Sequence, residues 1–287
     1  MLGQALFVLL YGLSFGMILF VISVGLAVTM GVMRVVNMAH AAFAATGAYL
    51  TVGLMNAWGV PIVPAIVLAA AIVVTISAPI ERLLYRPIYN RSELDQVLLT
   101  IGIVYVSIAA LTYVYGPDPI SAELPPWLYA KVAVASVEIQ AYRVAVIVLG
   151  AVMIAALWLL LNKTLFGVRL RAAVDNPGMA QVVGINVNRV YSAAFALGAA
   201  LAAIGGAAGY ALVQPEPTYA FKYLTLILFV VGLAGPGRLL ECATVAIAIG
   251  LADTAARFFV PQIGGYIVYV LAIALMIYRS RGVFHAR

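Results

Sequence analysis

The chain has 287 residues, of which 66% are hydrophobic and only 9% are charged, and its formal net charge is +6. This composition excludes an ordinary soluble domain, and in a membrane protein an excess of positive charge reflects the loops rather than nucleic-acid binding. The single cysteine, Cys242, excludes an internal disulfide and a thiol cluster for metal or redox chemistry.

Six windows carry no charged residue, and most of them meet the roughly 20 residues that a bilayer-spanning helix needs. Spans of this kind must be helices, because lipid offers backbone groups no other partner, and the runs lack the alternation of barrel strands. The windows are 1–33, 35–80, 96–117, 144–162, 190–215 and 258–278. The sequence therefore predicts an all-α polytopic membrane protein of about eight or nine transmembrane helices, forming a single domain over residues 1–287.

In chain order, the apolar N-terminus lacks a basic leader, which predicts a retained first span rather than a cleaved signal. The window 35–80 is long enough for two spans broken near residues 57–61. A span near 96–115 leads to a loop at 116–143, whose Gly and Pro residues predict a short ordered periplasmic cap. Another span follows at 144–161.

Residues 223–257 are harder to interpret, because Arg238, Glu241, Asp253 and Arg257 interrupt the apolar pattern. Two short spans that meet near Gly235-Pro236-Gly237 fit the pattern, and so does a re-entrant pair. Broken helices at membrane depth are tolerated where they pack in protein or line a wet cavity. Either geometry makes this interruption a candidate functional position.

Basic residues concentrate in three segments, 81–95, 163–189 and 279–287, which together hold 10 of the 16 Lys and Arg residues. Positive residues that flank spans are retained on the cytoplasmic side. The distribution predicts a periplasmic N-terminus and a cytoplasmic C-terminus.

The segment 162–189 is a polar island between two apolar spans. Within it, Asp175-Asn176-Pro177 is a helix-start signal, with Asp or Asn as the cap and Pro in the first turn. Apolar residues follow at Met179, Val182, Val183 and Ile185. This predicts a short amphipathic helix that docks in a groove of a cytoplasmic partner. The alternative is a solvated loop with snorkelling basic side chains.

Asn37 and His40 lie in an otherwise apolar stretch. Such residues either form a buried polar pair between helices or line a pathway, since polar groups at membrane depth tend to face cavities. No cluster of His, Cys and carboxylates has metal-ligand spacing, so we expect no metal site. Gly205, Gly206 and Gly209 favour close helix packing, and Tyr219 and Tyr223 are expected as interfacial anchors.

Four stretches carry a resemblance that covers almost the whole chain: NMAHAAFAATGAYL (37–50), TLFGVRLRAAVDNPGMAQVVGINV (164–187), AGPGRLLECA (234–243) and RSRGVF (279–284). In order and spacing they resemble the permease subunits of bacterial ABC importers for branched-chain amino acids, the first of the two related permeases. Ala41, Arg238 and Glu241 depart from the family pattern, in which Gly, a small polar residue and Gly are usual.

The resemblance implies a transmembrane permease with a fold like that of ribose and vitamin B12 importers, located in the bacterial inner membrane and importing branched-chain amino acids or a related small organic solute. It implies a second homologous permease, two ABC ATPase subunits and a periplasmic solute-binding protein as partners, with ATP and Mg²⁺ on the ATPases and no cofactor on this chain. The residues implied in coupling to the ATPase are Arg171, Asp175, Asn176, Pro177, Gly178, Ala180 and Gly184. Those implied in the translocation pathway are Asn37, His40, Gly232 and Gly235. The coupling block is expected to act on the spans at 25–50 and 226–251.

The chain has no G-x-x-x-x-G-K-[ST] phosphate loop, so ATP hydrolysis is expected on separate subunits. One alternative is an ion-coupled secondary transporter, which would carry an intramembrane carboxylate relay, and only Asp253 and Glu241 are candidates. A second is a membrane enzyme, which would need a nucleophile with a base or a metal cluster. Neither is visible in the sequence.

Overall fold

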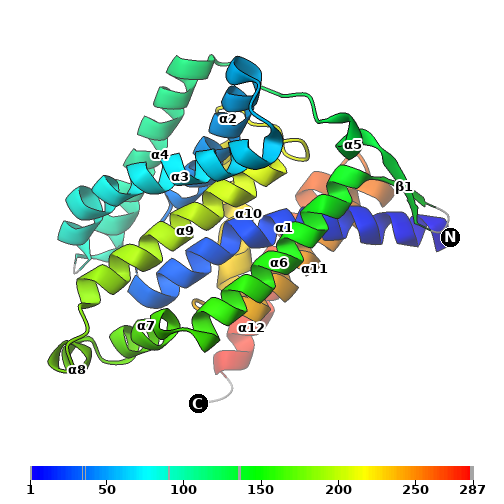
Figure 1. Cartoon of the computed structure of the whole chain (residues 1–287). Helices are drawn as coiled ribbons and strands as arrows, with labels where there is room; N and C mark the ends of the chain where they lie inside the picture. The colour runs from blue at the N-terminus through cyan, green and yellow to red at the C-terminus, as the bar shows by residue number, and fades with distance from the viewer. Residues whose placement is uncertain (1, 34, 36, 90, 135–136, 285–287) are drawn as a thin grey trace.

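A computed structural model describes residues 2–33, 35, 37–89, 91–134 and 137–284, and within these ranges the chain is almost entirely helical. The predicted all-α polytopic architecture is confirmed (Figure 1). The long helices are α1 (Leu2–Met33), α2 (His40–Trp58), α3 (Ile62–Ile80), α4 (Glu93–Tyr115), α6 (Ala141–Lys163), α9 (Val187–Gly209), α10 (Tyr219–Ala234), α11 (Leu239–Phe259) and α12 (Gly264–Phe284).

Six described helices are long and apolar enough to cross a bilayer: α1, α3, α4, α6, α9 and α11. Helix α10 is apolar but has only 16 residues. Two breaks predicted from the sequence are confirmed. The chain turns between α2 and α3 at Gly59, whose φ is +62°, and between α10 and α11 at Gly235 to Arg238.

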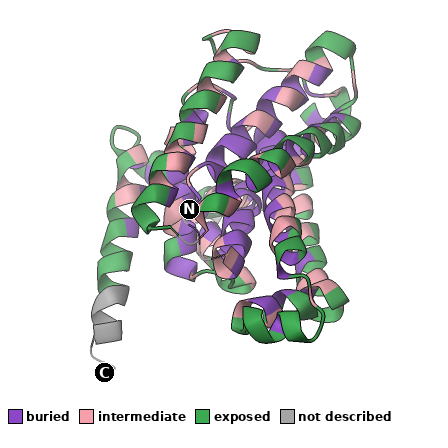
Figure 2. Cartoon of the chain, turned by 90° about the vertical axis from the view of Figure 1, so that its left-hand side faces the viewer, coloured by how far each residue is buried: buried purple, intermediate pink, exposed green. Residues whose placement is uncertain are grey.

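Helix α1 is the centre of the bundle. It packs most closely against α9 and α11, with further contacts to α6 and α10. From Gly16 to Val28 nearly every residue is buried, as expected for a helix that is apolar on all sides. Figure 2 shows the buried residues gathered along these inner helices and the exposed residues on the outer ones.

Small residues set the distance between the central helices, because they let backbones approach. A Cβ atom at Gly16 would lie 2.8 Å from Ile247 Cα on α11, and one at Gly205 would lie 2.5 Å from the Ile22 side chain on α1. Gly206 lies against Ala44 of α2 in the same way. The close-packing role predicted for the glycines of α9 is confirmed.

The loop between α4 and α6 is ordered, as predicted, but it contains elements that the sequence did not indicate. A short helix, α5 (Pro126–Tyr129), precedes an antiparallel hairpin of β1 (Lys131–Val134) and β2 (Val137–Gln140), in which Lys131 pairs with Gln140. Lys131 also forms an ion pair with Glu138 at 2.9 Å. The hairpin lies beside the start of α1 (Figure 1).

On the other side of the bundle, α3 continues into a π-helical turn, η1 (Glu81–Tyr85), and a 3-10 turn, η2 (Arg86–Ile88). The polar island forms α7 (Leu165–Asp175) and α8 (Pro177–Val182), between α6 and α9. Of the basic C-terminal segment, residues 285–287 lie outside the described residues.

Candidate functional site: the α7–α8 face and the cavity beneath it

The start of α8 follows the predicted signal. Pro177 is the first residue of the helix, and the Asn176 side chain caps it by accepting a hydrogen bond from the Met179 amide at 3.0 Å. Asp175 is instead the last residue of α7. Asn176 is therefore the cap. Pro177 sacrifices no helical hydrogen bond, because the N–H at this position has no partner within the helix.

The end of α8 is fixed as firmly as its start. Gly184 has a φ of +85°, its amide donates to Gln181 O at 3.0 Å, and the amide of Ile185 donates to Ala180 O at 2.9 Å. These two bonds form a Schellman motif, which requires a left-handed residue directly after the helix. Gly184 is thus needed for its backbone conformation.

The two faces of α8 have opposite environments. Ala180 is only 3% exposed and packs with Val28, Leu170 and Val187 in a small apolar cluster. On the opposite face Met179 is 61% exposed and Val182 is 80% exposed. Val183, just past the helix end, is also exposed. The amphipathic helix predicted from the sequence is confirmed, and its outer face is an apolar patch without a partner among the described residues.

Arg171 fastens α7 to the end of α6, because its Nη1 donates to the carbonyl oxygen of Leu161. Gly167 allows this turn, since a Cβ there would overlap the Leu161 backbone. The Thr164 side chain caps α7 by accepting from the Gly167 amide at 3.4 Å. The 11 residues of α7 therefore form a rigid platform for α8.

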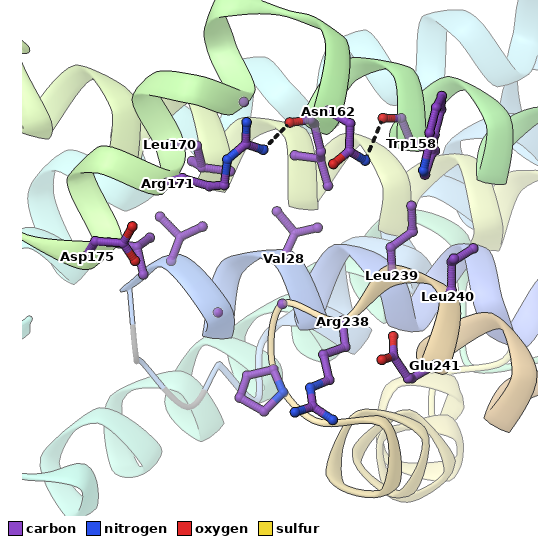
Figure 3. A pocket seen from close by; sticks show the side chains of 17 residues that line it. Val28, Trp158, Asn162, Leu170, Arg171, Asp175, Arg238, Leu239, Leu240 and Glu241 are labelled. Atoms are coloured by element: carbon purple, nitrogen blue, oxygen red, sulfur yellow. Dashed lines mark hydrogen bonds between the residues drawn. The ribbon is translucent and has the colours of Figure 1, made fainter.

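A cavity of about 600 Å³ lies between this platform and the core (Figure 3). Its wall is formed by the end of α1, the end of α6, one face of α7 and the turn between α10 and α11. Its charged residues include Arg171 and Asp175 from α7, Arg238 from the turn and Glu241 from the first turn of α11. The block 164–187 thus lines the same cavity as residues of the segments 25–50 and 226–251.

The turn between α10 and α11 is docked on α1. The Gly237 amide donates to Ala27 O at 2.8 Å, and a Cβ at Gly31 would lie 2.6 Å from Gly237 Cα. Arg238 and Glu241, which the sequence suggested as a neutralising pair, are both exposed. Among the described residues they form no ion pair with each other, and the pairing hypothesis is wrong, because neither side chain is enclosed enough to need a counter-charge.

Asn37 and His40 lie in the interior, and each has a partner. His40 Nε2–H donates to the carbonyl oxygen of Ile22 on α1, at 2.7 Å. Asn37 Oδ1 accepts a hydrogen bond from the Tyr85 hydroxyl at 2.6 Å. This is the geometry of a buried polar pair that joins helices. Pathway lining by these two residues stays a prediction.

The other two residues assigned to the pathway lie on α10 and its end. Gly232 is exposed on α10, on the side that faces Met276 of α12, and Gly235 ends α10 with a φ of +91°. Tyr219, expected as an interfacial anchor, is fully buried instead, with its ring 4.7 Å from that of Tyr223. That expectation is wrong because α10 starts inside the bundle.

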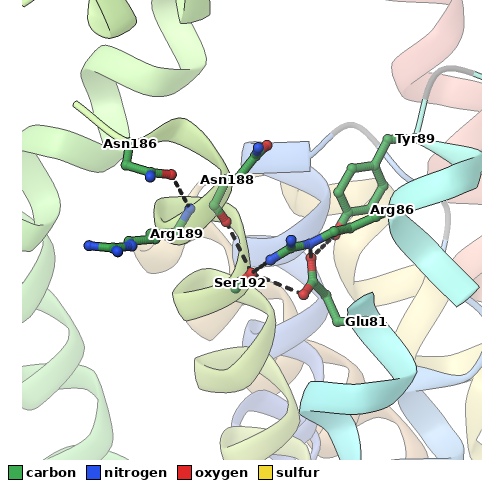
Figure 4. Close-up of polar contacts among 7 residues, drawn as sticks. All are labelled: Glu81, Arg86, Tyr89, Asn186, Asn188, Arg189 and Ser192. Carbon is green, nitrogen blue, oxygen red and sulfur yellow. Dashed lines mark hydrogen bonds and ion pairs between the residues drawn. The ribbon is translucent and has the colours of Figure 1, made fainter. Parts of the chain in front are cut away.

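A polar cluster that was not predicted from the sequence connects η1 to α9 (Figure 4). Glu81 is 2% exposed, and its Oε1 accepts from Arg86 Nε at 3.0 Å and from the Tyr89 hydroxyl at 2.7 Å. Its Oε2 accepts from the Ser192 hydroxyl at 2.9 Å, and Arg86 Nη2 donates to Ser192 at 2.7 Å.

Burial and the hydrogen bond to Glu81 raise the pKa of Tyr89 well above its ordinary value, so Tyr89 stays a donor to this carboxylate. The available signal was a lone acid at the end of a charge-free window. Its partner on α9 lies 111 residues away in sequence, which no local pattern reveals.

Across the described ranges, no three His, Cys, Asp or Glu side chains gather as a metal site would require. The chain matches the family described as "Branched-chain amino acid transport system / permease component" over residues 8–278. It belongs to this permease family.

Three relatives show how far the similarity of this permease extends. It is 24% identical to the high-affinity branched-chain amino acid transport system permease protein BraD of Pseudomonas aeruginosa, over 96% of this chain and 94% of the relative. It is 26% identical to the probable branched-chain amino acid transport permease protein LivH of Methanocaldococcus jannaschii, over 91% and 84%. The LivH permease of Escherichia coli is 25% identical over 68% and 67%. These matches give no support to an ion-coupled secondary transporter.

Proposed function

We propose that this permease is one membrane subunit of an ATP-driven importer that moves branched-chain or related apolar amino acids into the cytoplasm. The family match and the names of the relatives support this solute class. The permease works with a second homologous permease, two ABC ATPase subunits and a periplasmic solute-binding protein. The ATPase subunits hold ATP and Mg²⁺. It lies in the inner membrane with its N-terminus in the periplasm and its C-terminus in the cytoplasm.

The observation that carries this proposal is the exposed apolar face of α8. A helix of six residues is too short to be stable alone, yet α8 is held by Asn176 at its start, by Gly184 at its end and by Ala180 in the cluster below. Exposed apolar residues on a preorganised helix are a typical surface for a helix-in-groove contact. The groove belongs to the ATPase.

Movement of the ATPase reaches the spans through rigid contacts. A push on α8 is transmitted to α7, which packs against α1 and lines the cavity that it shares with the α10–α11 turn. Gly232 and Gly235 lie at the end of α10, next to that turn, and face the pathway that the two permeases form together. Alternating access then follows from a shift of α1 and of the turn as one unit.

The test is to replace Val182 by Glu in the complete importer. The charge enters the centre of the contact, so we expect the ATPase to be lost on copurification and solute-stimulated ATP hydrolysis to fall at least tenfold, while the two permeases stay paired. Leu94→Glu is the matched control, because Leu94 is also exposed, at the start of α4 beside Glu93 and Asp95. Normal copurification and hydrolysis with Val182→Glu would contradict the proposal.

A further inference from the structure

A second cavity, of about 530 Å³, lies at the other end of the bundle from α8. Along α1, Phe7 in this cavity is roughly 36 Å from Gly31 in the first one, at 1.5 Å per residue. Its walls come from the start of α1, the start of α6, the segment after α9, and the helices α10, α11 and α12. Its volume is that of a site for a small molecule.

One wall carries a positive charge without a counter-charge. The Arg143 guanidinium lies 4.1 Å from the centre of the Tyr11 ring, and its Nη1 donates to the Ser14 hydroxyl at 3.1 Å. No carboxylate of the described residues pairs with Arg143. The Tyr11 ring and the Ser14 hydroxyl offset only part of the cost of partly burying this cation at the edge of a membrane span, and an anion bound in the cavity would supply the missing counter-charge.

The other two cations of the cavity already have partners. Lys222 pairs with Glu216 at 2.7 Å, and Arg257 Nε donates to Asp253 Oδ2 at 2.8 Å. The second carboxylate oxygen of Asp253, Oδ1, is buried and has no hydrogen-bond partner among the described residues. The cavity therefore has an unpaired guanidinium on α6 and a carboxylate with an unused acceptor on α11.

The rest of the lining is largely aromatic. Phe7 stacks on Tyr11 with ring centres 4.0 Å apart and contacts Phe258 at 5.3 Å, while Tyr223 and Tyr269 line the side formed by α10 and α12. Such a lining accepts an apolar or aromatic group, and its few polar groups fix the orientation of the ligand.

We propose that this cavity is a binding site for a small zwitterion with an apolar body. The ligand carboxylate pairs with Arg143, the ligand ammonium lies on the side of the cavity formed by Asp253, and the side chain lies among Phe7, Tyr11 and Phe258. The assignment deepens the proposed function and rests on it for the kind of solute. A phosphatidylethanolamine molecule also carries an anionic group and an ammonium group on an apolar body, so a lipid is the alternative ligand.

The test uses the full-length permease in phosphatidylcholine nanodiscs, with binding measured by calorimetry. We expect L-phenylalanine to bind, 3-phenylpropionate to bind more weakly because it lacks the ammonium, and phenethylamine to bind weakest because it lacks the carboxylate. Arg143→Gln should lower the affinity for L-phenylalanine roughly tenfold or more, because a charged hydrogen bond is lost. Arg143→Lys keeps most of the affinity.

Lys131→Gln is the matched control, because it also removes a positive charge at this end of the bundle but lies in β1, outside the cavity. It should leave L-phenylalanine binding unchanged, and an unaltered melting temperature of Arg143→Gln shows that this variant is folded. The assignment would be overturned if folded Arg143→Gln bound L-phenylalanine as tightly as the wild type. It would also be overturned if Lys131→Gln lost as much affinity for L-phenylalanine as Arg143→Gln.

A second arm separates the two sources of the ligand. Replacing a fifth of the phosphatidylcholine by phosphatidylethanolamine should leave L-phenylalanine affinity unchanged if the site takes a free solute. The alternative result is that phosphatidylethanolamine raises the melting temperature of the wild-type permease but not of Arg143→Gln, and that L-phenylalanine does not bind. This result would assign the site to lipid and overturn the solute proposal.

Uptake by the assembled importer separates the binding-site proposal from the proposed function. Retained binding without ATP-driven uptake contradicts the proposed function alone, and normal uptake by Arg143→Gln contradicts a role for this cavity in transport.

Discussion

The amide of Gly237 donates a hydrogen bond to the carbonyl oxygen of Ala27 at 2.8 Å, and this bond fastens the α10–α11 turn to the end of the central helix. The contact exists because Gly31 has no side chain. Because of this contact, a displacement of α1 is expected to move the turn with it.

Gly31→Ala tests this contact. The new Cβ would lie 2.6 Å from Gly237 Cα, and since backbone atoms cannot rotate away, we expect the turn to lift and the free energy of unfolding to fall by about 1–3 kcal/mol. Thermal melting in detergent measures the loss, and coupled ATP hydrolysis should fall with it. Gly102→Ala is the control, because a Cβ at Gly102 meets no atom within 4 Å and alanine favours the helix. Equal melting temperatures for both variants would contradict the close contact.

The Glu81 cluster gives a prediction about stability. Glu81→Ala removes the carboxylate that accepts from Arg86, Tyr89 and Ser192, so we expect a loss of about 3 kcal/mol, near the lower limit for breaking a buried ion pair because Arg86 is partly exposed. The melting temperature of the purified chain reports it. Glu138→Gln breaks an ion pair whose side chains are both largely exposed and should cost less than about 1 kcal/mol. A small effect of Glu81→Ala would show that the cluster does not hold η1 against α9.

The end of α8 gives a prediction about backbone conformation. Gly184→Ala places a Cβ at a φ of +85°, which costs roughly 1–2 kcal/mol and distorts the turn after α8. Asparagine tolerates this conformation, so Gly184→Asn should keep ATPase copurification that Gly184→Ala reduces. A bulky Gly184→Trp change mixes this strain with obstruction of the surface, which is why Val182 is the better position for testing the contact itself. Identical behaviour of the Ala and Asn variants would remove the conformational explanation.

Orientation is tested by single cysteines in a Cys242→Ala background. Cys242 is fully buried, and its replacement removes the one native thiol of the sequence. Gly178→Cys, in exposed α8, should be protected from an impermeant thiol reagent in intact cells, whereas Ser121→Cys, exposed in the loop between α4 and α6, should react. Membrane disruption should make position 178 reactive, which controls for burial. Labelling of position 178 in intact cells would reverse the topology.

The sequence predicted the positions of the helices well, because charge-free windows and breaks at Gly59 and Gly235 are local signals. The start of α8 was predicted for the same reason, since Asn176 and Pro177 act within one turn. Which helices pack together was not predictable. Helix α1 is apolar on every side, so no hydrophobic stripe indicates the direction of α9 or α11.

The sites show the same division. The exposed apolar face of α8 was predicted because Met179, Val182 and Val183 follow helical spacing. The partners of Asn37 and His40 were left open, because Tyr85 and the Ile22 carbonyl come from other elements. Arg238 and Glu241 were interpreted as a pair from their spacing alone, and the structure exposes both. The second cavity was not predicted, because the residues that line it come together only in the folded chain.

The central position of α1 has a consequence for how the protein is made. Helix α1 ends at Met33, whereas its main partner α11 begins at Leu239. At about 5–20 residues per second, synthesis needs on the order of ten to forty seconds to reach α11. Until α6 and α9 are made, α1 lacks most of its partners and must remain in the bilayer mainly by its own affinity for lipid, and its mean hydropathy of 2.5 exceeds the 1.7 of α9 and the 1.6 of α11. The later helices enter a membrane that already contains the surface on which they pack, so nascent chains that stop before residue 239 are expected to insert without closing the bundle.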